Sequence, residues 1–229
     1  MSASAYFITG TDTEIGKTFV SCALLQRARA QGLRAAGLKP VAAGTEADGE
    51  NEDVRQILAA SNLQLPREQV NRYCFQAAIA PHLAAREEGR AIDFAAIAGD
   101  LASARQQADF LIVEGAGGFR VPLGVDRNGR PQDSADLAVA LGLPVIFVVG
   151  MRLGCINHSL LSIEAIAARG LHLAGWVANR IDPAMSRFEE NLQTLQELFP
   201  APLLGVIPHA PAGGAAGAAD WLQLPAAQR

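Results

Sequence analysis

The stretch GTDTEIGKT, residues 10–18, determines how the rest of the chain is interpreted. It nearly matches the consensus G-x-x-x-x-G-K-[ST] of a phosphate-binding loop (P-loop), whose backbone N–H groups surround phosphate oxygens. Gly16, Lys17 and Thr18 fit the consensus, whereas Thr11 stands where the first glycine belongs and the glycine comes one residue earlier. We expect Lys17 to reach the β- and γ-phosphates and the Thr18 hydroxyl to bind Mg²⁺. The alternative is a coincidental G-K-T, which is disfavoured because the pattern predicts a buried strand before the loop and a helix after it.

Length and composition indicate a single domain over residues 1–229. Half of the 229 residues are apolar, which suffices for one large core. The formal net charge is −4, with 18% charged residues and no basic run, so neither nucleic acid nor a membrane is expected as a partner. The N-terminus lacks the pattern of a signal peptide, and no apolar stretch of about 18 residues occurs. Together with three widely spaced cysteines, these features predict a cytoplasmic protein with reduced thiols.

Apolar runs alternate with stretches of helical spacing along the chain. Runs such as FLIV and IFVV do not alternate polar with apolar residues, so they predict strands that are buried on both faces. Strands are expected at residues 6–9, 35–41, 109–113, 144–149, 173–178 and 203–207. Helices are expected at residues 16–30, 94–107, 156–169 and 186–198. This order predicts an α/β fold with a doubly wound, mostly parallel sheet flanked by helices.

The end of the chain differs in composition. The piece PAGGAAGAA, residues 211–219, is rich in glycine and alanine, which predicts a loop. We therefore expect residues 211–229 to form a mobile C-terminal segment.

Glu114 follows a predicted strand and precedes the glycine-rich segment GAGG. A carboxylate at the carboxyl end of a central strand faces the crevice where open α/β sheets bind ligands, so Glu114 is a candidate to hold Mg²⁺. The glycines permit close approach of the backbone to a ligand. The alternative is a solvated glutamate in a turn.

Further polar candidates stand at element ends. Lys39, in GLKPVAAG, ends a predicted strand, and Pro40 would fix the backbone that aims its ammonium group, although a surface lysine fits the pattern equally well. Asp53 lies in the first turn of a predicted helix, where the helix dipole favours an acid with or without a metal. Asn179 ends another strand, and such amides bind nucleotide bases or simply form turns. The four histidines show no metal-ligand spacing.

Six blocks of the sequence resemble the dethiobiotin synthetase family. They are GTDTEIGKT, GLKPVAAG, VEGAGG, VVGMRLGCINHSLLS, GWVANR and PLLGVIPH, in the family's order over residues 6–210. The resemblance implies a P-loop NTPase-like fold and an ATP-dependent ligase (a cyclo-ligase) of biotin biosynthesis. This reaction uses ATP to join 7,8-diaminononanoate with CO₂ or bicarbonate into dethiobiotin, through a carbamate and a carbamic–phosphoric anhydride. Mg²⁺ is implied as the cofactor and a homodimer as the assembly.

The resemblance also implies residue roles. Lys17 and Lys39 are the implied catalytic residues, with Lys39 facing the carbamate and the γ-phosphate. The implied ATP-binding residues are Thr13, Glu14, Ile15, Gly16, Lys17, Thr18, Phe19, Asp53, Glu114, Gly115, Ala116, Gly117, Asn179, Arg180, Pro208, His209 and Ala210. The implied substrate-binding residues are Ala43, Gly154, Cys155, Ile156 and Asn157, the last four at a helix start that the partner subunit contributes. The implied metal ligands are Thr18, Asp53 and Glu114.

Two departures and two alternatives qualify this interpretation. Ala43 stands where the family commonly has serine, so one hydrogen bond of about 1 kcal/mol to the substrate is lost, moved or replaced by water. The segment 121–136 is longer than the family leads us to expect. A P-loop synthetase of the cobyrinate-amidating type is disfavoured because 229 residues leave no room for a glutaminase domain. A non-catalytic nucleotide switch of the partition-ATPase type is disfavoured because Asp12 stands where such switches often carry a lysine.

Overall fold

One parallel sheet forms the centre of the molecule. In the computed structural model, which describes residues 3–226, six parallel strands stand in the order β10-β9-β8-β1-β5-β2. These strands are β1 (Ser4–Gly10), β2 (Ala35–Leu38), β5 (Phe110–Glu114), β8 (Val145–Gly150), β9 (Leu173–Asn179) and β10 (Leu203–Ile207). Strands β5 and β8 are buried along their whole length, which explains why their sequences are apolar on both faces. The predicted doubly wound, parallel sheet is confirmed.

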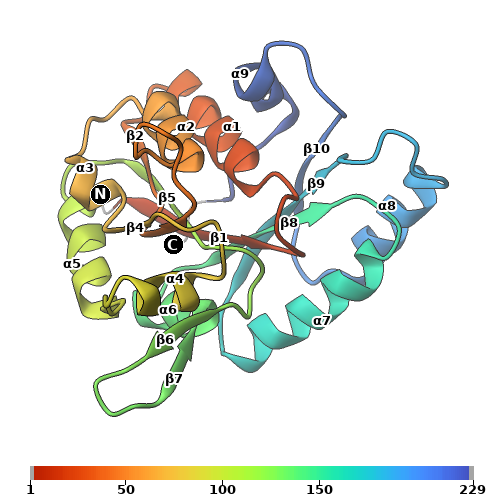
Figure 1. Cartoon of the computed structure of the whole chain (residues 1–229). Helices are drawn as coiled ribbons and strands as arrows, with labels where there is room; N and C mark the ends of the chain where they lie inside the picture. The colour runs from red at the N-terminus through yellow and green to blue at the C-terminus, as the bar shows by residue number, and fades with distance from the viewer. Residues whose placement is uncertain (1–2, 227–229) are drawn as a thin grey trace.

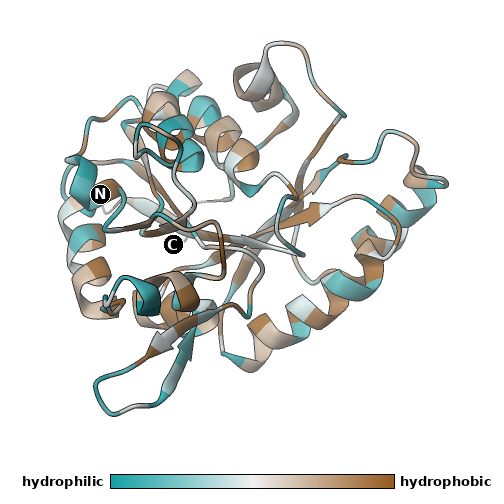
Figure 2. Cartoon of the chain, viewed as in Figure 1, coloured by the Kyte–Doolittle hydropathy of each residue, from teal (hydrophilic) through white to brown (hydrophobic). Residues whose placement is uncertain are grey.

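Helices cover both faces of the sheet (Figure 1). On one face lie α1 (Lys17–Ala30), α2 (Glu52–Ala60) and the short α9 (Gly214–Ala218). On the other lie α5 (Phe94–Arg105), α6 (Ser134–Leu141), α7 (Cys155–Ala168) and α8 (Phe188–Leu198). Hydrophobic residues follow the central strands in Figure 2, and hydrophilic residues gather on the outer helices and loops. The helix that follows β1 covers one face of the sheet, whereas the helices that follow β5, β8 and β9 cover the other face. The loop after β1 therefore lies at the switch point where such sheets bind ligands.

The single strand predicted at residues 35–41 is wrong in one respect, because the structure breaks it at Lys39 and Pro40. Strand β2 ends at Leu38, and β3 (Val41–Ala43) instead pairs with β4 (Tyr73–Phe75) in a small second sheet. Proline has no N–H to donate to a ladder, so the pairing cannot continue through this point. The break places the Lys39 side chain at the carboxyl edge of the central sheet.

The segment 121–136, whose role the sequence leaves open, forms a hairpin and the start of a helix. Strands β6 (Pro122–Val125) and β7 (Pro131–Asp133) pair antiparallel, and Figure 1 shows the hairpin extending from the body of the protein. Asp133 then caps α6, because its carboxylate accepts the N–H of Asp136 at 2.9 Å while the Asp136 carboxylate accepts the N–H of Asp133 at 2.9 Å.

The loop predicted at residues 211–219 is wrong in part, since Gly214–Ala218 form α9. This helix packs against α1, and the 3₁₀ turn η1 (Ala219–Trp221) follows it. Leu222, 1% exposed, then bridges to Gly205 of β10. The mobility of this segment stays a prediction, and residues 227–229 lie outside the described part.

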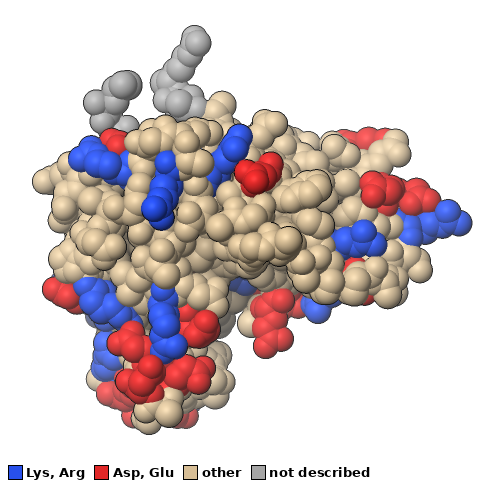
Figure 3. Space-filling view, turned by 90° about the horizontal axis from the view of Figure 1, so that it is seen from above, with Lys and Arg blue, Asp and Glu red and all other residues tan. Residues whose placement is uncertain are grey.

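Two further short helices, α3 (Arg67–Val70) and α4 (Pro81–Glu87), connect the small β3–β4 sheet to the rest of the chain. Across residues 3–226, no helix combines the length and apolar character that crossing a membrane requires. On the face shown in Figure 3, acidic and basic side chains lie next to one another in mixed groups, and wide uncharged areas separate these groups.

Candidate active site

The loop between β1 and α1 depends on Gly16. This residue has φ of +83°, in the left-handed region, and a Cβ added here would lie 2.3 Å from the Asn179 side-chain nitrogen. That nitrogen donates a hydrogen bond to the Ile15 carbonyl oxygen at 2.8 Å. Asn179, at the end of β9, therefore lies against the loop and holds its backbone. Base recognition by Asn179 stays a prediction.

The displaced glycine of the motif has a packing reason. A Cβ on Gly10 would lie 2.6 Å from the Val148 carbonyl oxygen of neighbouring β8, so only glycine fits the approach of the two strands. The next residue, Thr11, uses both its backbone and its side chain on β8. Its N–H donates to the Val148 oxygen at 3.0 Å, and its hydroxyl accepts the Gly150 N–H at 3.3 Å. Glycine at position 10 and threonine at position 11 thus join the loop to β8.

The side chain of Lys17, the first residue of α1, contacts the loop. Its ammonium group donates to the Asp12 carbonyl oxygen at 2.6 Å, and burial together with the nearby charge of Lys39 lowers the pKa of Lys17 to about 8. The Asp12 carboxylate pairs with Arg152 at 2.7 Å. The loop is therefore connected to the segment that precedes α7.

Glu114 is the centre of a buried polar cluster. Its side chain is fully buried and accepts three hydrogen bonds, from the Thr18 hydroxyl at 2.7 Å, the Ser21 hydroxyl at 2.6 Å and the Lys39 ammonium at 2.6 Å. Lys39 also pairs with Asp53, whose Oδ2 lies 3.0 Å from Nζ. Four segments distant in the sequence, α1, the end of β2, α2 and the end of β5, thus meet at the carboxyl edge of the sheet.

Lys39 and Asp53 both keep their charges. Burial opposes ionisation of Lys39, but the carboxylates of Glu114 and Asp53 outweigh it and raise the pKa of Lys39. Burial likewise opposes ionisation of Asp53, but the charge and hydrogen bond of Lys39 lower the pKa of Asp53. The cluster is a desolvated cation between two carboxylates, one buried and one partly exposed.

Thr18, Asp53 and Glu114 fit the donor set that Mg²⁺ prefers. Each offers an oxygen atom, and the two carboxylates are close enough to share one ammonium group. No cluster of three His, Cys, Asp or Glu side chains suited to a metal occurs among residues 3–226. Mg²⁺ commonly binds through one or two carboxylates together with phosphate oxygens and water, so this set is suited to a metal that arrives with a nucleotide.

A cleft of about 590 Å³ opens beside this cluster. Seven of the predicted site residues line it, namely Thr13, Glu14, Lys39, Ala43, Asp53, Ala116 and Gly117. The apolar wall of the cleft, formed by Ile79, Ala80 and Pro81 at the start of α4, was not predicted from the sequence, because a short apolar run before a helix matches no known binding motif. It also missed Ser21, whose signal was a hydroxyl one turn after Thr18 on the buried face of α1.

Two predicted site residues face the core instead of the cleft. Ile15 is fully buried, and a Cβ on Gly150 would lie 2.5 Å from its side chain, so Ile15 can offer a nucleotide only its backbone. Phe19 packs against the hydrophobic core. Gly115 contributes its carbonyl oxygen, 3.5 Å from the Lys39 ammonium.

The remaining predicted nucleotide residues gather at the ends of β9 and β10, outside the cleft lining. The guanidinium of Arg180 lies over the Phe188 ring at 4.7 Å and donates to the Pro183 carbonyl oxygen, so this side chain is engaged away from the loop. His209 lies 3.3 Å from the Arg180 carbonyl oxygen. Pro208 and Ala210 flank it, and Ala210 has a positive φ of 45°.

The four residues predicted to bind the substrate carboxylate form the start of α7. Gly154 takes a left-handed φ of 94°, Cys155 is buried, and Ile156 and Asn157 follow in the first helical turn. None of the four lines the cleft described above.

The chain is similar in sequence to known proteins over nearly its whole length. A family model described as "AAA domain" matches residues 4–216. The chain is 59% identical over 224 residues to the ATP-dependent dethiobiotin synthetase BioD of Aromatoleum aromaticum, covering 96% of this chain and 97% of that protein. It is 53% identical over 224 residues to the protein of the same name from Pseudomonas paraeruginosa, covering 96% of each.

Solved structures resemble the fold at low sequence identity. The MinC:MinD cell division protein complex of Aquifex aeolicus matches with a TM-score of 0.57 at 13% identity, over 99% of both chains. MinD from Pyrococcus horikoshii, complexed with Mg-ADP, matches with a TM-score of 0.51 at 14% identity, over 93% of this chain and 86% of that chain. These similarities support the P-loop fold alone.

Proposed function

The chain belongs to the family of ATP-dependent dethiobiotin synthetases, and from this premise we propose how its cleft performs the reaction. The substrates are 7,8-diaminononanoate, CO₂ and ATP, and the products are dethiobiotin, ADP and phosphate. One substrate amine first adds to CO₂ to form a carbamate. A carbamate oxygen then attacks the γ-phosphorus and ADP leaves, which gives a carbamic–phosphoric anhydride. The neighbouring amine attacks the carbamoyl carbon, phosphate leaves, and the ureido ring closes.

The P-loop binds and orients the triphosphate. The Lys17 ammonium exchanges its 2.6 Å bond to the Asp12 carbonyl for oxygens of the β- and γ-phosphates, and the backbone N–H groups of residues 14–18 surround them. Phosphoryl transfer depends on positioning and charge neutralisation more than on covalent help from the protein. Thr18, Asp53 and Glu114 would hold Mg²⁺, which when bound neutralises phosphate charge.

Lys39 is the second catalytic group. The residue lines the cleft, and its flexible stem allows the ammonium to turn from Glu114 and Asp53 toward the carbamate and γ-phosphate without movement of the backbone. A cation at that point stabilises the charge that develops on the transferred group. The observation that carries the proposal is the convergence of Lys17, Lys39 and Glu114 beside one cleft at the switch point of the sheet.

The test is a coupled ADP-release assay on the purified protein. We expect ADP release only when both 7,8-diaminononanoate and bicarbonate are present with MgATP, and dethiobiotin should appear in equal amount. ADP release that ignores the diamine would contradict the proposal. Turnover that instead requires glutamine or ammonia would indicate an amidating synthetase.

The proposed assembly is a homodimer in which each active site takes the start of α7 from the partner subunit. Two observations support this arrangement. The residues Gly154–Asn157 lie outside the cleft of their own chain. Large apolar side chains are exposed nearby, with Leu153 93% and Leu161 58% exposed.

Mixing two weakened variants tests this assembly. In a mixed dimer of Lys39→Ala and Asn157→Ala subunits, one of the two sites combines the unchanged Lys39 of one subunit with the unchanged Asn157 of the other. Activity should therefore recover on mixing. If both residues acted within one chain, each site would carry one defect and mixing would restore nothing.

The proposed location is the cytoplasm. All three cysteines, Cys22, Cys74 and Cys155, are free thiols, which agrees with a reducing compartment.

A further inference from the structure

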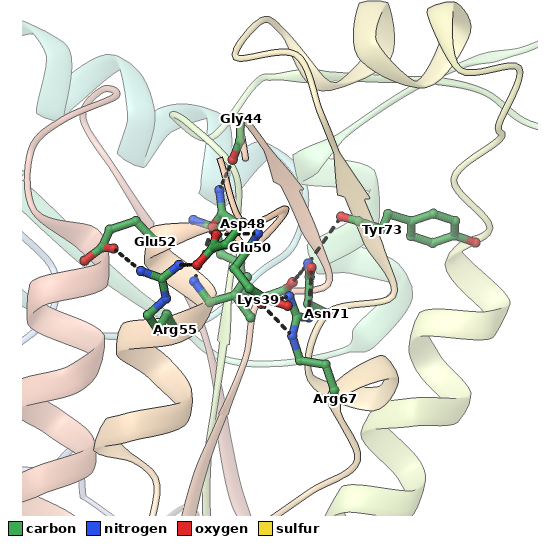
Figure 4. A network of polar contacts seen from close by, with 11 residues as sticks. Lys39, Gly44, Asp48, Glu50, Glu52, Arg55, Arg67, Asn71 and Tyr73 are labelled. Atoms are coloured by element: carbon green, nitrogen blue, oxygen red, sulfur yellow. Dashed lines mark hydrogen bonds and ion pairs between the residues drawn. The ribbon is translucent and has the colours of Figure 1, made fainter. Parts of the chain in front are cut away.

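The backbone of Lys39 is held by contacts outside the central sheet. Strand β2 ends at Leu38, and the Lys39 N–H donates to the Val70 carbonyl oxygen at 2.8 Å. The Lys39 carbonyl oxygen accepts a hydrogen bond from the Asn71 side-chain nitrogen at 2.5 Å. The same nitrogen donates to the Tyr73 carbonyl oxygen at 3.2 Å, so Asn71 joins the break after β2 to β4 (Figure 4).

Asn71 binds the Lys39 carbonyl oxygen at a point where the central sheet provides no hydrogen-bond donor. Pro40 has no N–H, so the pairing of β2 cannot run through this peptide, and the Lys39 carbonyl needs another donor. Asn71 is only 5% exposed, so few water molecules can replace it. Leaving a buried carbonyl without a donor is unfavourable, and the backbone would shift to find one.

The orientation of Asn71 is itself fixed. Its side-chain oxygen accepts a hydrogen bond from the Arg67 guanidinium at 3.2 Å, and Arg67 also binds Glu50 through two nitrogens at 3.2 and 2.8 Å. A guanidinium group only donates, so it keeps the oxygen of the Asn71 amide toward Arg67 and the nitrogen toward the two carbonyls. Figure 4 shows this chain of contacts leading from Glu50 to Lys39.

We propose that Asn71, oriented by Arg67, is a positioning residue that sets where the Lys39 ammonium can reach; this rests on the proposed catalytic role of Lys39. The Lys39 head group must change partners during turnover, so its reach is determined by where its backbone is anchored. Asn71 provides that anchor at the carbonyl, and the Val70 carbonyl provides it at the N–H. A misplacement of about 1 Å at a catalytic group can lower the rate by about 100-fold.

The first test compares Asn71→Ala with the control Asn62→Ala. Asn62 is exposed and contacts the backbone at the other end of β2, donating to the Leu33 carbonyl at 2.9 Å and accepting the Ala35 N–H at 2.7 Å. We expect Asn71→Ala to lower kcat tenfold or more, with the KM for ATP within twofold because the P-loop is untouched. Asn62→Ala should lose stability in urea yet keep kcat within twofold. Equal kcat losses in the two variants would mean a merely structural role and would overturn the inference.

Arg67→Met provides a second, milder test that keeps Asn71 in place. The Arg67 side chain is 34% exposed, so this variant should fold even if Asn71→Ala does not. We expect kcat to fall several-fold with the KM for ATP unchanged, and the double variant should be no worse than Asn71→Ala, because Arg67 acts through Asn71. Wild-type kcat in Arg67→Met, or independent losses that multiply in the double variant, would count against the inference.

Lys39→Ala, measured beside these variants, distinguishes a failure of the proposed catalytic role of Lys39 from a failure of the positioning role of Asn71. If Lys39→Ala turns over normally, the proposed function of Lys39 is wrong. If Lys39→Ala is inactive while folded Asn71→Ala keeps wild-type kcat, the positioning role of Asn71 is wrong and the proposed function stands.

Discussion

The pairing of Lys39 with Glu114 leads to a prediction that separates stability from catalysis. The two side chains are 6% and 0% exposed, and their charged atoms lie 2.6 Å apart. Removing one partner of such a pair leaves an uncompensated buried charge, which typically costs about 3–5 kcal/mol of the free energy of unfolding. For Lys39→Met we expect about 3 kcal/mol, the lower end, because Glu114 keeps hydroxyl donors from Thr18 and Ser21. A domain with a stability of about 5–15 kcal/mol should survive this loss.

The double variant Lys39→Met/Glu114→Gln removes both charges at once. Its destabilisation should be smaller than the sum of the two single changes by about 2 kcal/mol, because neither partner is left buried and unpaired. Asp53, which also pairs with Lys39, has a side chain that is 43% exposed and can be solvated. Turnover should stay absent in Lys39→Met and in the double variant, since the proposed reaction needs the ammonium group.

The assay is urea unfolding of the wild type, both single variants and the double variant at one pH, beside ADP release from each. Destabilisations that add within about 0.5 kcal/mol would refute the coupling and with it the view of Lys39 and Glu114 as a desolvated pair. A double variant that regains turnover would refute the catalytic role of Lys39.

Two further predictions concern single positions. Gly16→Ala should weaken ATP binding about tenfold or more in calorimetry, because φ is +83° and the new Cβ would meet Asn179 at 2.3 Å. The control Gly32→Ala, at φ of +79° with nothing within 4 Å of the new Cβ, should leave ATP binding unchanged. Equal losses of affinity in the two variants would refute this prediction. Side-chain and backbone hydrogen bonds from Arg34 lower the pKa of Asp109 to about 2. Since this is below the value of about 3.9 in unfolded chains, the interaction stabilises the fold above about pH 4 and is lost as the pH falls toward 2. Asp109→Asn should therefore be less stable than wild type at pH 6, with the difference vanishing near pH 2; a pH-independent difference in urea unfolding would contradict this.

Much of the fold follows from local patterns. Both faces of β5 and β8 are buried, so their sequences are continuously apolar, and the alternation of such runs with helical spacing predicts the parallel sheet. The strand predicted through Lys39 and Pro40 was wrong because a proline in an apolar run still reads as part of a strand. Only the folded structure shows where the run breaks, because the residues before the break pair with β5 and those after it pair with β4.

The candidate site likewise contains residues that the sequence predicts and residues that it does not. Gly16, Lys17 and Thr18 form a contiguous motif, and Glu114 stands where a strand ends, so their proximity can be predicted from the order of elements. Asn71 and Ser21 are common polar residues without a motif. Their contacts with Lys39 and Glu114 exist only after segments far apart in the sequence have packed.

The phosphate-binding loop can be recognised in the sequence alone, because the backbone turn at Gly16 and the charge at Lys17 are local properties of nine consecutive residues. The parallel sheet can be recognised in the same way, because burial on both faces demands apolar runs. Packing of the whole chain is needed to make Lys39 a buried cation between Glu114 and Asp53 instead of a surface lysine. Burying a charge is unfavourable unless opposite charges are brought to it, and those charges come from parts of the chain that meet only in the folded protein.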